Sequence, residues 1–313
     1  MVWVFALGRL ALRASQGQHV EGSIPFAPHA LVWFTTSRLN DLSLLRYAKV
    51  LIMNSISPAG LEINLHGKTA LVTGASGQLG RVMVRTLAQA GAGVAIHYHR
   101  NEAQALALCA ELRAQGRAAA VFQADVTEEA SVLRLRDAVR EQLGDPHILV
   151  NNAVIQYAWT SVLEQSIEDF EGQFRSTVLH NVFMAKAFAP AMVNKGSGRI
   201  IAINTECAML CAPTSGAYVS GKRGLDGLVR VLARELGPHG VTVNQVAPGW
   251  TISDRSRTDG TESQSAYEAD IPLRRRGDDQ EIANVVAFLA SDLASYISGV
   301  YLPVCGGHVM PAI

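Results

Sequence analysis

Beyond residue 62 the chain alternates between short apolar runs and longer segments in which apolar residues recur every three or four positions. Short apolar runs indicate buried strands, and the longer periodic segments indicate helices. The predicted strands are residues 69–72, 93–98, 118–123, 148–150, 199–203, 241–246 and 300–304. The predicted helices are residues 81–90, 101–115, 128–143, 166–194, 218–236 and 282–291. Strands that alternate with helices predict an α/β fold, a single-domain doubly wound parallel sheet with helices on both faces.

The first 62 residues lack this alternation, and we predict an N-terminal extension of uncertain status. Arg9 and Arg13 precede the first acidic residue, Glu21, which loosely fits an organelle transit peptide, although the tryptophans of this stretch fit it poorly. Met53 stands just ahead of the first predicted strand. Three interpretations stay open: translation that starts at Met53, a disordered or loosely packed extension, or a targeting segment.

The composition excludes several classes of protein. Of the 313 residues, 49% are hydrophobic and 17% are charged, and the formal net charge is zero. Nucleic-acid binding needs a basic face, which this balance does not suggest, and no apolar run is long enough to predict a membrane span. The four cysteines form no Cys-x-x-Cys pair and no zinc-type cluster with histidine, so we expect no metal site. Unpaired thiols fit a reducing compartment, and we expect a cytoplasmic protein.

A glycine-rich loop joins the first predicted strand to the first predicted helix. Glycines let the backbone turn tightly and approach a pyrophosphate, and the first turn of the helix adds amide donors and the positive end of its dipole. Between a strand and a helix, this pattern indicates the dinucleotide site of a Rossmann fold. The loop residues predicted to bind the cofactor are Gly74, Ser76, Gly77, Gln78, Leu79 and Gly80.

Further polar residues follow the ends of the next strands. Asp125 follows the strand at 118–123, and Asn151 follows the strand at 148–150. Ligands of doubly wound sheets bind outside the carboxyl ends of the strands, so both residues are candidates for the cofactor site.

The end of the second strand bears on the choice of cofactor. An acidic residue usually holds the ribose 2′-hydroxyl of NAD there, whereas this chain has His99 and Arg100. Both could face a 2′-phosphate, which favours NADP(H) and leaves NAD(H) as the alternative. Arg100 could also be a solvated loop cation.

Tyr218 and Lys222 are the candidate catalytic pair. Their spacing of four places both side chains on one face of the helix predicted at 218–236. A free tyrosine has a pKa of about 10 and is a poor acid–base catalyst at neutral pH. A nearby ammonium group favours the phenolate, so Tyr218 could exchange a proton with an alcohol or ketone oxygen.

Taken together, these motifs resemble those of the short-chain dehydrogenase/reductase family, in the same order and over residues 64–307. The shared motifs are Thr73-Gly74 with Gly80, Asp125-Val126, Asn151-Asn152-Ala153, Tyr218 with Lys222, Val243-Asn244, Pro248-Gly249 and Ile271-Pro272-Leu273. The resemblance implies that residues 63–313 are an NAD(P)-binding Rossmann catalytic domain. The site residues that it implies are Tyr218 as acid/base, Lys222 beside it and on the nicotinamide ribose, and Asp125, Val126, Asn151, Ala153, Pro248 and Gly249 along the cofactor.

The chain departs from the family pattern at three positions. Gln78 stands where the second glycine of the loop belongs, and Thr205 stands at the position of the substrate-orienting serine, where it keeps the hydroxyl donor. Thr177 replaces the family's relay asparagine. Asn181, one helical turn further, is either its substitute or an ordinary polar helix residue.

By resemblance, the activity is reversible hydride transfer between NADP(H) and a carbonyl or secondary alcohol. A 3-oxoacyl thioester is the first substrate class, and a sugar or polyol is the alternative. The departures leave a second alternative, a cofactor-binding regulatory protein without turnover. The charged segment 251–277 is expected to close over the substrate, where its arginines could meet an acidic group or an acyl carrier. Family members pair through their long helices, so we expect a homodimer or homotetramer.

Overall fold

The structure is a computed structural model that describes residues 20–26, 30–36 and 62–311. The chain divides into two compact units, Met1–Glu62 and Ile63–Ile313. In the first unit, β1 (Val20–Phe26) and β2 (Ala30–Thr36) form an antiparallel pair, which the sequence periodicity does not predict. Met53 and the segment considered for targeting before Val20 lie outside the described residues.

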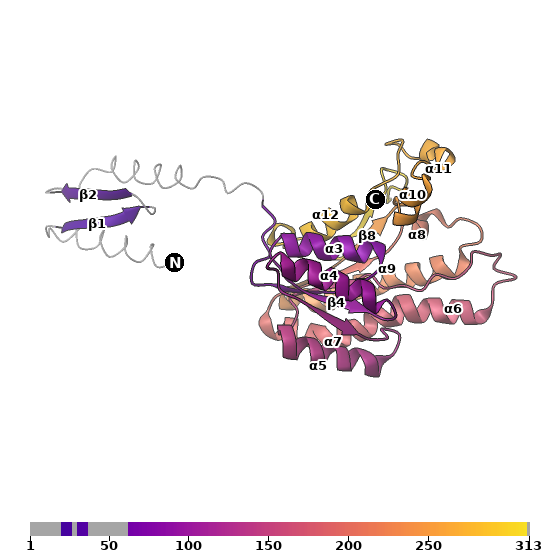
Figure 1. The fold of residues 1–313 in the computed structure, drawn as a ribbon, viewed down its shortest axis with the longest axis horizontal. Coiled ribbons are helices and arrows are strands. Elements are labelled where there is room, and N and C mark those ends of the chain that lie inside the picture. Colours follow the sequence, from indigo (N-terminus) through magenta and orange to yellow (C-terminus); the bar gives the residue numbers. More distant parts are fainter. Residues whose placement is uncertain (1–19, 27–29, 37–61, 312–313) are drawn as a thin grey trace. The chain divides into compact units, whose positions relative to one another are not determined.

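The second unit is built on one seven-stranded parallel sheet in the order β5-β4-β3-β6-β7-β8-β9 (Figure 1). Its strands are β3 (Thr69–Val72), β4 (Gly93–Tyr98), β5 (Ala119–Gln123), β6 (Ile148–Asn151), β7 (Gly198–Ile203), β8 (Val241–Pro248) and β9 (Tyr301–Val304). The first strand of this sheet, β3, lies near its middle. The next strands, β4 and β5, follow on one side, and β6 to β9 follow in order on the other side. The predicted doubly wound α/β fold is confirmed.

Helices cover both faces because successive residues of a strand point to opposite sides of the sheet. Ala70 and Val72 belong to the core beneath one set of helices, and Leu71 belongs to the core on the opposite face. The first set is α3 (Gln78–Gln89), α4 (Glu102–Ala114) and α12 (Asp279–Ala290), and the second is α5 (Glu129–Leu143), α7 (His180–Lys195) and α9 (Gly216–Leu236) (Figure 1).

Shorter helices lie in the connections. They are α6 (Ile167–Phe174), α8 (Cys207–Leu210), α10 (Asp254–Asp259) and α11 (Ser265–Asp270), with 3₁₀ turns at Gly237–His239 and Asp292–Ala294. In the described ranges, no helix is both long and apolar enough to cross a bilayer.

The helix predicted at 166–194 is interrupted. Between α6 and α7, residues Arg175–Leu179 form a π-helical turn. The side-chain amide of Asn181 donates to the Thr177 carbonyl at 2.8 Å, which in a regular α-helix accepts the backbone N–H of residue 181. A side chain that takes a helix carbonyl in this way disturbs the regular pattern, so the sequence periodicity alone misses the π turn.

Candidate active site

The glycine loop lies against the chain that leaves β6. Gly74 has a φ of +63°, and a Cβ built there would lie 3.0 Å from the Cα of Ala153. A Cβ on Gly80 would lie 2.3 Å from the Gly74 carbonyl oxygen, closer than real contacts allow. Gly77 caps α3 without a side chain, so the amides of the first helical turn stay available to an anion. The loop therefore keeps the cradle expected for a pyrophosphate.

His97, which the sequence motifs do not identify, fixes this loop from β4. Its Nδ1 accepts the Gly74 N–H at 3.0 Å, and its Nε2 lies 3.1 Å from the Ala124 carbonyl oxygen. The Nε2–H tautomer satisfies both bonds. Burial lowers the pKa of His97 to about 4, so the neutral ring is the stable form at neutral pH. In the sequence, the feature that could have identified His97 is its position in a largely apolar predicted strand.

The side chain of Gln78 points away from the loop. Its Nε2 donates to the Ile252 carbonyl at 2.8 Å and lies 3.4 Å from an Asp279 oxygen. Arg81 completes this connection by donating to the Ser76 carbonyl and pairing with Asp254. The residue in place of the family glycine thus links the loop to segment 251–277.

His99 and Arg100 lie exposed at the end of β4, beside Asp125. Nε2 of His99 is 3.7 Å from the Asp125 carboxylate, which also accepts two hydrogen bonds from Thr127. Burial opposes ionisation of Asp125, but the Thr127 hydrogen bonds and the two neighbouring cationic side chains outweigh it and lower the pKa. The structure places these predicted cofactor residues together.

Asn151 and Ala153 lie where β6 ends. The side-chain amide of Asn151 donates to Oδ1 of the Asn181 side chain at 2.7 Å. The N–H of Ala153 donates to the Thr73 hydroxyl at 3.0 Å, which holds this chain against the glycine loop. Asn181 is buried and bridges Asn151 to the π turn at Thr177.

Tyr218 and Lys222 lie in the first turns of α9, as the spacing predicts. The ammonium nitrogen of Lys222 lies 5.8 Å from the centre of the Tyr218 ring and donates to the Ile203 carbonyl at 2.7 Å. Burial lowers the pKa of Lys222 to about 8. Burial also raises the pKa of Tyr218 to about 12, although a hydrogen bond with Thr205 acts in the opposite direction. The net lowering of the Tyr218 pKa that we expected is therefore not found for the protein groups alone, because desolvation outweighs the interactions that favour the phenolate.

Thr205 is buried just after β7, where its backbone is held on both sides. Its N–H donates to Asn204 at 2.9 Å, and its carbonyl accepts the Tyr301 hydroxyl at 2.6 Å. The Thr205 hydroxyl oxygen accepts the Cys207 N–H at 3.2 Å, so its own proton can be donated to another oxygen.

Segment 251–277 contains the short helices α10 and α11. The buried guanidinium of Arg276 donates to the carbonyls of Trp250, Thr251 and Glu262 and lies 4.6 Å from the Trp250 ring. Arg275 pairs with Glu281 at 2.7 Å. Arg276 therefore organises the segment itself, and Arg275 ties it to α12.

Apolar side chains flank Tyr218 on the chain that follows β6. The Trp159 ring lies 6.2 Å from the Tyr218 ring. Ile155, Val162 and Leu163 are exposed on the same stretch. Trp159 therefore lies beside Tyr218, and the other three apolar side chains share its stretch of chain.

Comparison with known proteins identifies the family. Residues 74–308 match the family model described as enoyl-(acyl carrier protein) reductase. The 3-oxoacyl-(acyl-carrier-protein) reductase FabG of Escherichia coli K12 is 39% identical over 249 residues, which are 79% of this chain and 100% of that protein.

Two solved structures share the fold. A gluconate 5-dehydrogenase from Burkholderia cenocepacia J2315, in complex with NADP and tartrate, has a TM-score of 0.73 and 29% identity, and covers 79% of this chain and 97% of its own. A blue fluorescent protein from a metagenomic library, in complex with NADPH, has a TM-score of 0.73 and 37% identity. The match covers 79% of this chain and 100% of that protein's chain. The chain belongs to the short-chain dehydrogenase/reductase family, as its motifs predict, and is an oxidoreductase of the class that interconverts carbonyl and CH–OH groups.

Proposed function

We propose that this protein reduces a carbonyl with NADPH, and that a 3-oxoacyl thioester is its substrate class. The observation that carries the proposal is the placement of Tyr218, Lys222 and Thr205 at the carboxyl end of the sheet, together with an intact glycine cradle. Thr205 follows the end of β7, and Tyr218 and Lys222 lie on α9. The predicted catalytic and cofactor-binding residues form part of this proposal.

The residues around the cradle fit NADP(H). Gly74 and Gly80 let the loop pack closely against Ala153 and against itself, where a Cβ would clash. Arg100 supplies a cationic group, and His99 a ring N–H donor, where a 2′-phosphate would lie. The complexes of the two solved relatives with NADP and NADPH support this choice. NAD(H) stays the alternative. Along the cofactor we place Asp125 and the predicted residues Val126, Asn151, Ala153, Pro248 and Gly249.

A bound nicotinamide would supply the hydride for the carbonyl carbon, and residues of this chain act on the carbonyl oxygen. Thr205 donates a hydrogen bond to the substrate oxygen and orients it. Tyr218 transfers its phenolic proton to that oxygen as the C–H bond forms, so a secondary alcohol and a phenolate result. The ammonium of Lys222 stabilises the phenolate, which then takes a proton from solvent.

The surroundings of Tyr218 favour an acyl chain over a polyol. Trp159 presents an apolar ring beside it, and Ile155 and Leu163 are exposed on the same stretch of chain, whereas a polyol would need convergent polar groups. The FabG relative acts on a 3-oxoacyl group by its name. The gluconate 5-dehydrogenase neighbour keeps sugar or polyol oxidation as the second candidate.

Two measurements on the purified chain test the proposal. Thermal-shift titrations with NADPH and NADH should show the larger stabilisation with NADPH, because at equal concentration the ligand with the lower Kd stabilises the native state more. NADPH oxidation is then followed with a 3-oxoacyl thioester, and NADP reduction with gluconate as the contrasting substrate. If the chain binds the cofactor but turns over no carbonyl or alcohol, the proposed activity is contradicted and a regulatory protein is favoured. A larger shift with NADH would overturn the cofactor choice.

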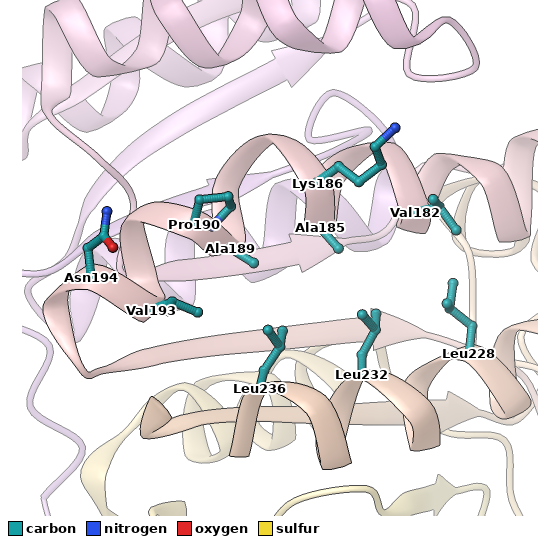
Figure 2. A pocket seen from close by; sticks show the side chains of 10 residues that line it. All are labelled: Val182, Ala185, Lys186, Ala189, Pro190, Val193, Asn194, Leu228, Leu232 and Leu236. Atoms are coloured by element: carbon teal, nitrogen blue, oxygen red, sulfur yellow. The ribbon is translucent and has the colours of Figure 1, made fainter. Parts of the chain in front are cut away.

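A homodimer or homotetramer is proposed from an apolar groove between α7 and α9 (Figure 2). Leu228, Leu232 and Leu236 line it from α9, and Val182 and Val193 face them from α7. Light scattering on Leu232→Glu should show a smaller assembly than the wild type. The matched control is Val231→Glu, since Val231 lies exposed on the same helix outside the groove.

The location in the cell is proposed as cytoplasmic. All four cysteines lie among the described residues and are unpaired, as expected in a reducing compartment. Fractionation of cells that express the native chain tests this point, and recovery in an organelle would contradict it.

A further inference from the structure

We propose that Glu206 is a positioning residue that fixes helix α11 over the substrate oxygen site, through a hydrogen bond from Tyr267 and a contact with His308. The proposal rests on the proposed function, since it takes Thr205, the neighbouring residue, as the group that orients the substrate. Neither Glu206 nor its two partners is predicted to be functional by the motifs of the sequence.

The carboxylate of Glu206 is buried, with 2% of the residue exposed, and both of its oxygens have partners. Oε1 accepts the Tyr267 hydroxyl at 2.6 Å, and Oε2 lies 3.0 Å from Nδ1 of His308. Burying a carboxylate is costly unless it is fully hydrogen-bonded, and here both oxygens are occupied. Its two side-chain partners come from distant parts of the sequence, α11 and the chain after β9.

The tyrosine is held as tightly as the carboxylate. The Tyr267 hydroxyl also accepts the Trp250 N–H at 2.8 Å, and its ring packs edge-on against Trp250 and His308, with centres 5.4 and 5.1 Å away. A Cβ on Gly249 would lie 3.0 Å from the Tyr267 oxygen, so this position is glycine where the hydroxyl approaches the backbone. Burial and Glu206 both raise the pKa of Tyr267, which keeps it a donor.

The backbone transmits this arrangement to the reaction site. The N–H of Glu206 donates to the Pro248 carbonyl at 2.9 Å, and the Thr205 carbonyl accepts the Tyr301 hydroxyl. Thr205 and Glu206 are therefore fixed as one short rigid piece after β7. A helix docked on Glu206 is thereby docked at a defined distance from the Thr205 hydroxyl.

The two halves of segment 251–277 are held by different contacts. Helix α10 is tied to α12 by Arg257, which pairs with Asp278 and Asp279 at 3.2 and 3.1 Å. Helix α11 is held through the Tyr267 hydroxyl, which bonds Glu206 and Trp250, and Arg274 donates to the carbonyl of its Ala269. Loss of the Tyr267 hydroxyl should therefore release α11 while α10 stays in place.

The experiment compares Tyr267→Phe with Tyr296→Phe, a matched control at a fully exposed tyrosine. Hydrogen–deuterium exchange of the cofactor-free chain should rise about tenfold or more at residues 265–271 in Tyr267→Phe, since a hydrogen bond to a charged group is lost. Exchange at residues 254–259 should be unchanged. Unchanged exchange at 265–271, or an equal rise in both helices, would overturn the positioning role.

Kinetics and a conservative variant complete the test. Tyr267→Phe should raise KM for the carbonyl substrate about tenfold with little change in kcat or in the Kd of NADPH. Glu206→Gln, whose amide oxygen still accepts from Tyr267, should keep most of the protection that Glu206→Ala loses. If Glu206→Gln and Glu206→Ala lose the same amount of exchange protection, the role of this hydrogen bond is overturned. Absence of turnover in every variant would contradict the proposed function, whereas the exchange data would still decide on Glu206.

Discussion

Replacing Lys222 by methionine should stabilise the folded chain at neutral pH while it abolishes turnover. Lys222 is 4% exposed, and burial lowers its pKa from 10.5 to about 8. That difference corresponds to about 3 kcal/mol by which the native state disfavours the charged lysine at pH 7. Methionine fills a similar volume without the charge.

Part of this gain is lost again. Lys222 donates to the Ile203 carbonyl at 2.7 Å, and methionine leaves that buried acceptor without its donor, at a cost of about 1–3 kcal/mol. The expected net change at pH 7 is a stabilisation of about 1 kcal/mol, or roughly 2–4 °C in Tm for a unit of this size.

The pH dependence of the stability difference distinguishes the effect of the buried charge from the effect of side-chain packing. The folded-state pKa lies below the unfolded value, so the penalty is fully present below pH 8 and disappears as the pH rises towards 10.5. The penalty falls from about 3 kcal/mol at pH 7 to about 2 kcal/mol at pH 9, and the advantage of Lys222→Met should shrink by the same roughly 1 kcal/mol.

Urea unfolding of the wild type and Lys222→Met at pH 7 and pH 9, without cofactor and at one protein concentration, measures this difference. Titrations of the other groups cancel in the comparison. A variant whose stability relative to the wild type is the same at both pH values would refute the assignment of a buried, destabilised ammonium. Full activity of the variant would refute its catalytic role.

Two further predictions concern the glycine loop. Gly80→Ala should abolish NADPH binding in a thermal-shift titration, because its Cβ would lie 2.3 Å from the Gly74 carbonyl oxygen and distort the loop. Alanine usually favours a helix over glycine by about 1 kcal/mol, so helix propensity does not explain such a loss. His97, with its pKa lowered to about 4, is neutral in the folded state, so stability should fall as the pH drops from about 6.5 towards 4, and His97→Gln should show a shallower fall in acid denaturation. Retained binding in the first case, or an unchanged acid profile in the second, would contradict these arguments.

The sheet was predictable because each strand is a short apolar run between periodic helices. Residues such as Leu71 and Val72 are buried on opposite faces, and a doubly wound sheet is what buries both. The π turn at Thr177 was not predictable, because it depends on the side chain of Asn181 taking one carbonyl. Apolar periodicity carries no information about such a bond.

Within the candidate site, the predictable residues were those with a local motif. Tyr218 and Lys222 share a helix face, and Gly74 belongs to a loop of fixed spacing. Their protonation was not predictable, because burial depends on the whole fold and raises the pKa of Tyr218. Glu206 and Tyr267 are 61 residues apart, and only the folded chain brings them together.

The central claim is that Tyr218 supplies the proton in an NADPH-dependent carbonyl reduction. The most direct measurement is NADPH oxidation with a 3-oxoacyl thioester by the wild type and by Tyr218→Phe, with NADPH binding to both followed by thermal shift. The account predicts that the variant still binds NADPH and that its rate falls at least about a hundredfold, the usual contribution of a positioned general acid. A variant that keeps the wild-type rate would contradict the account.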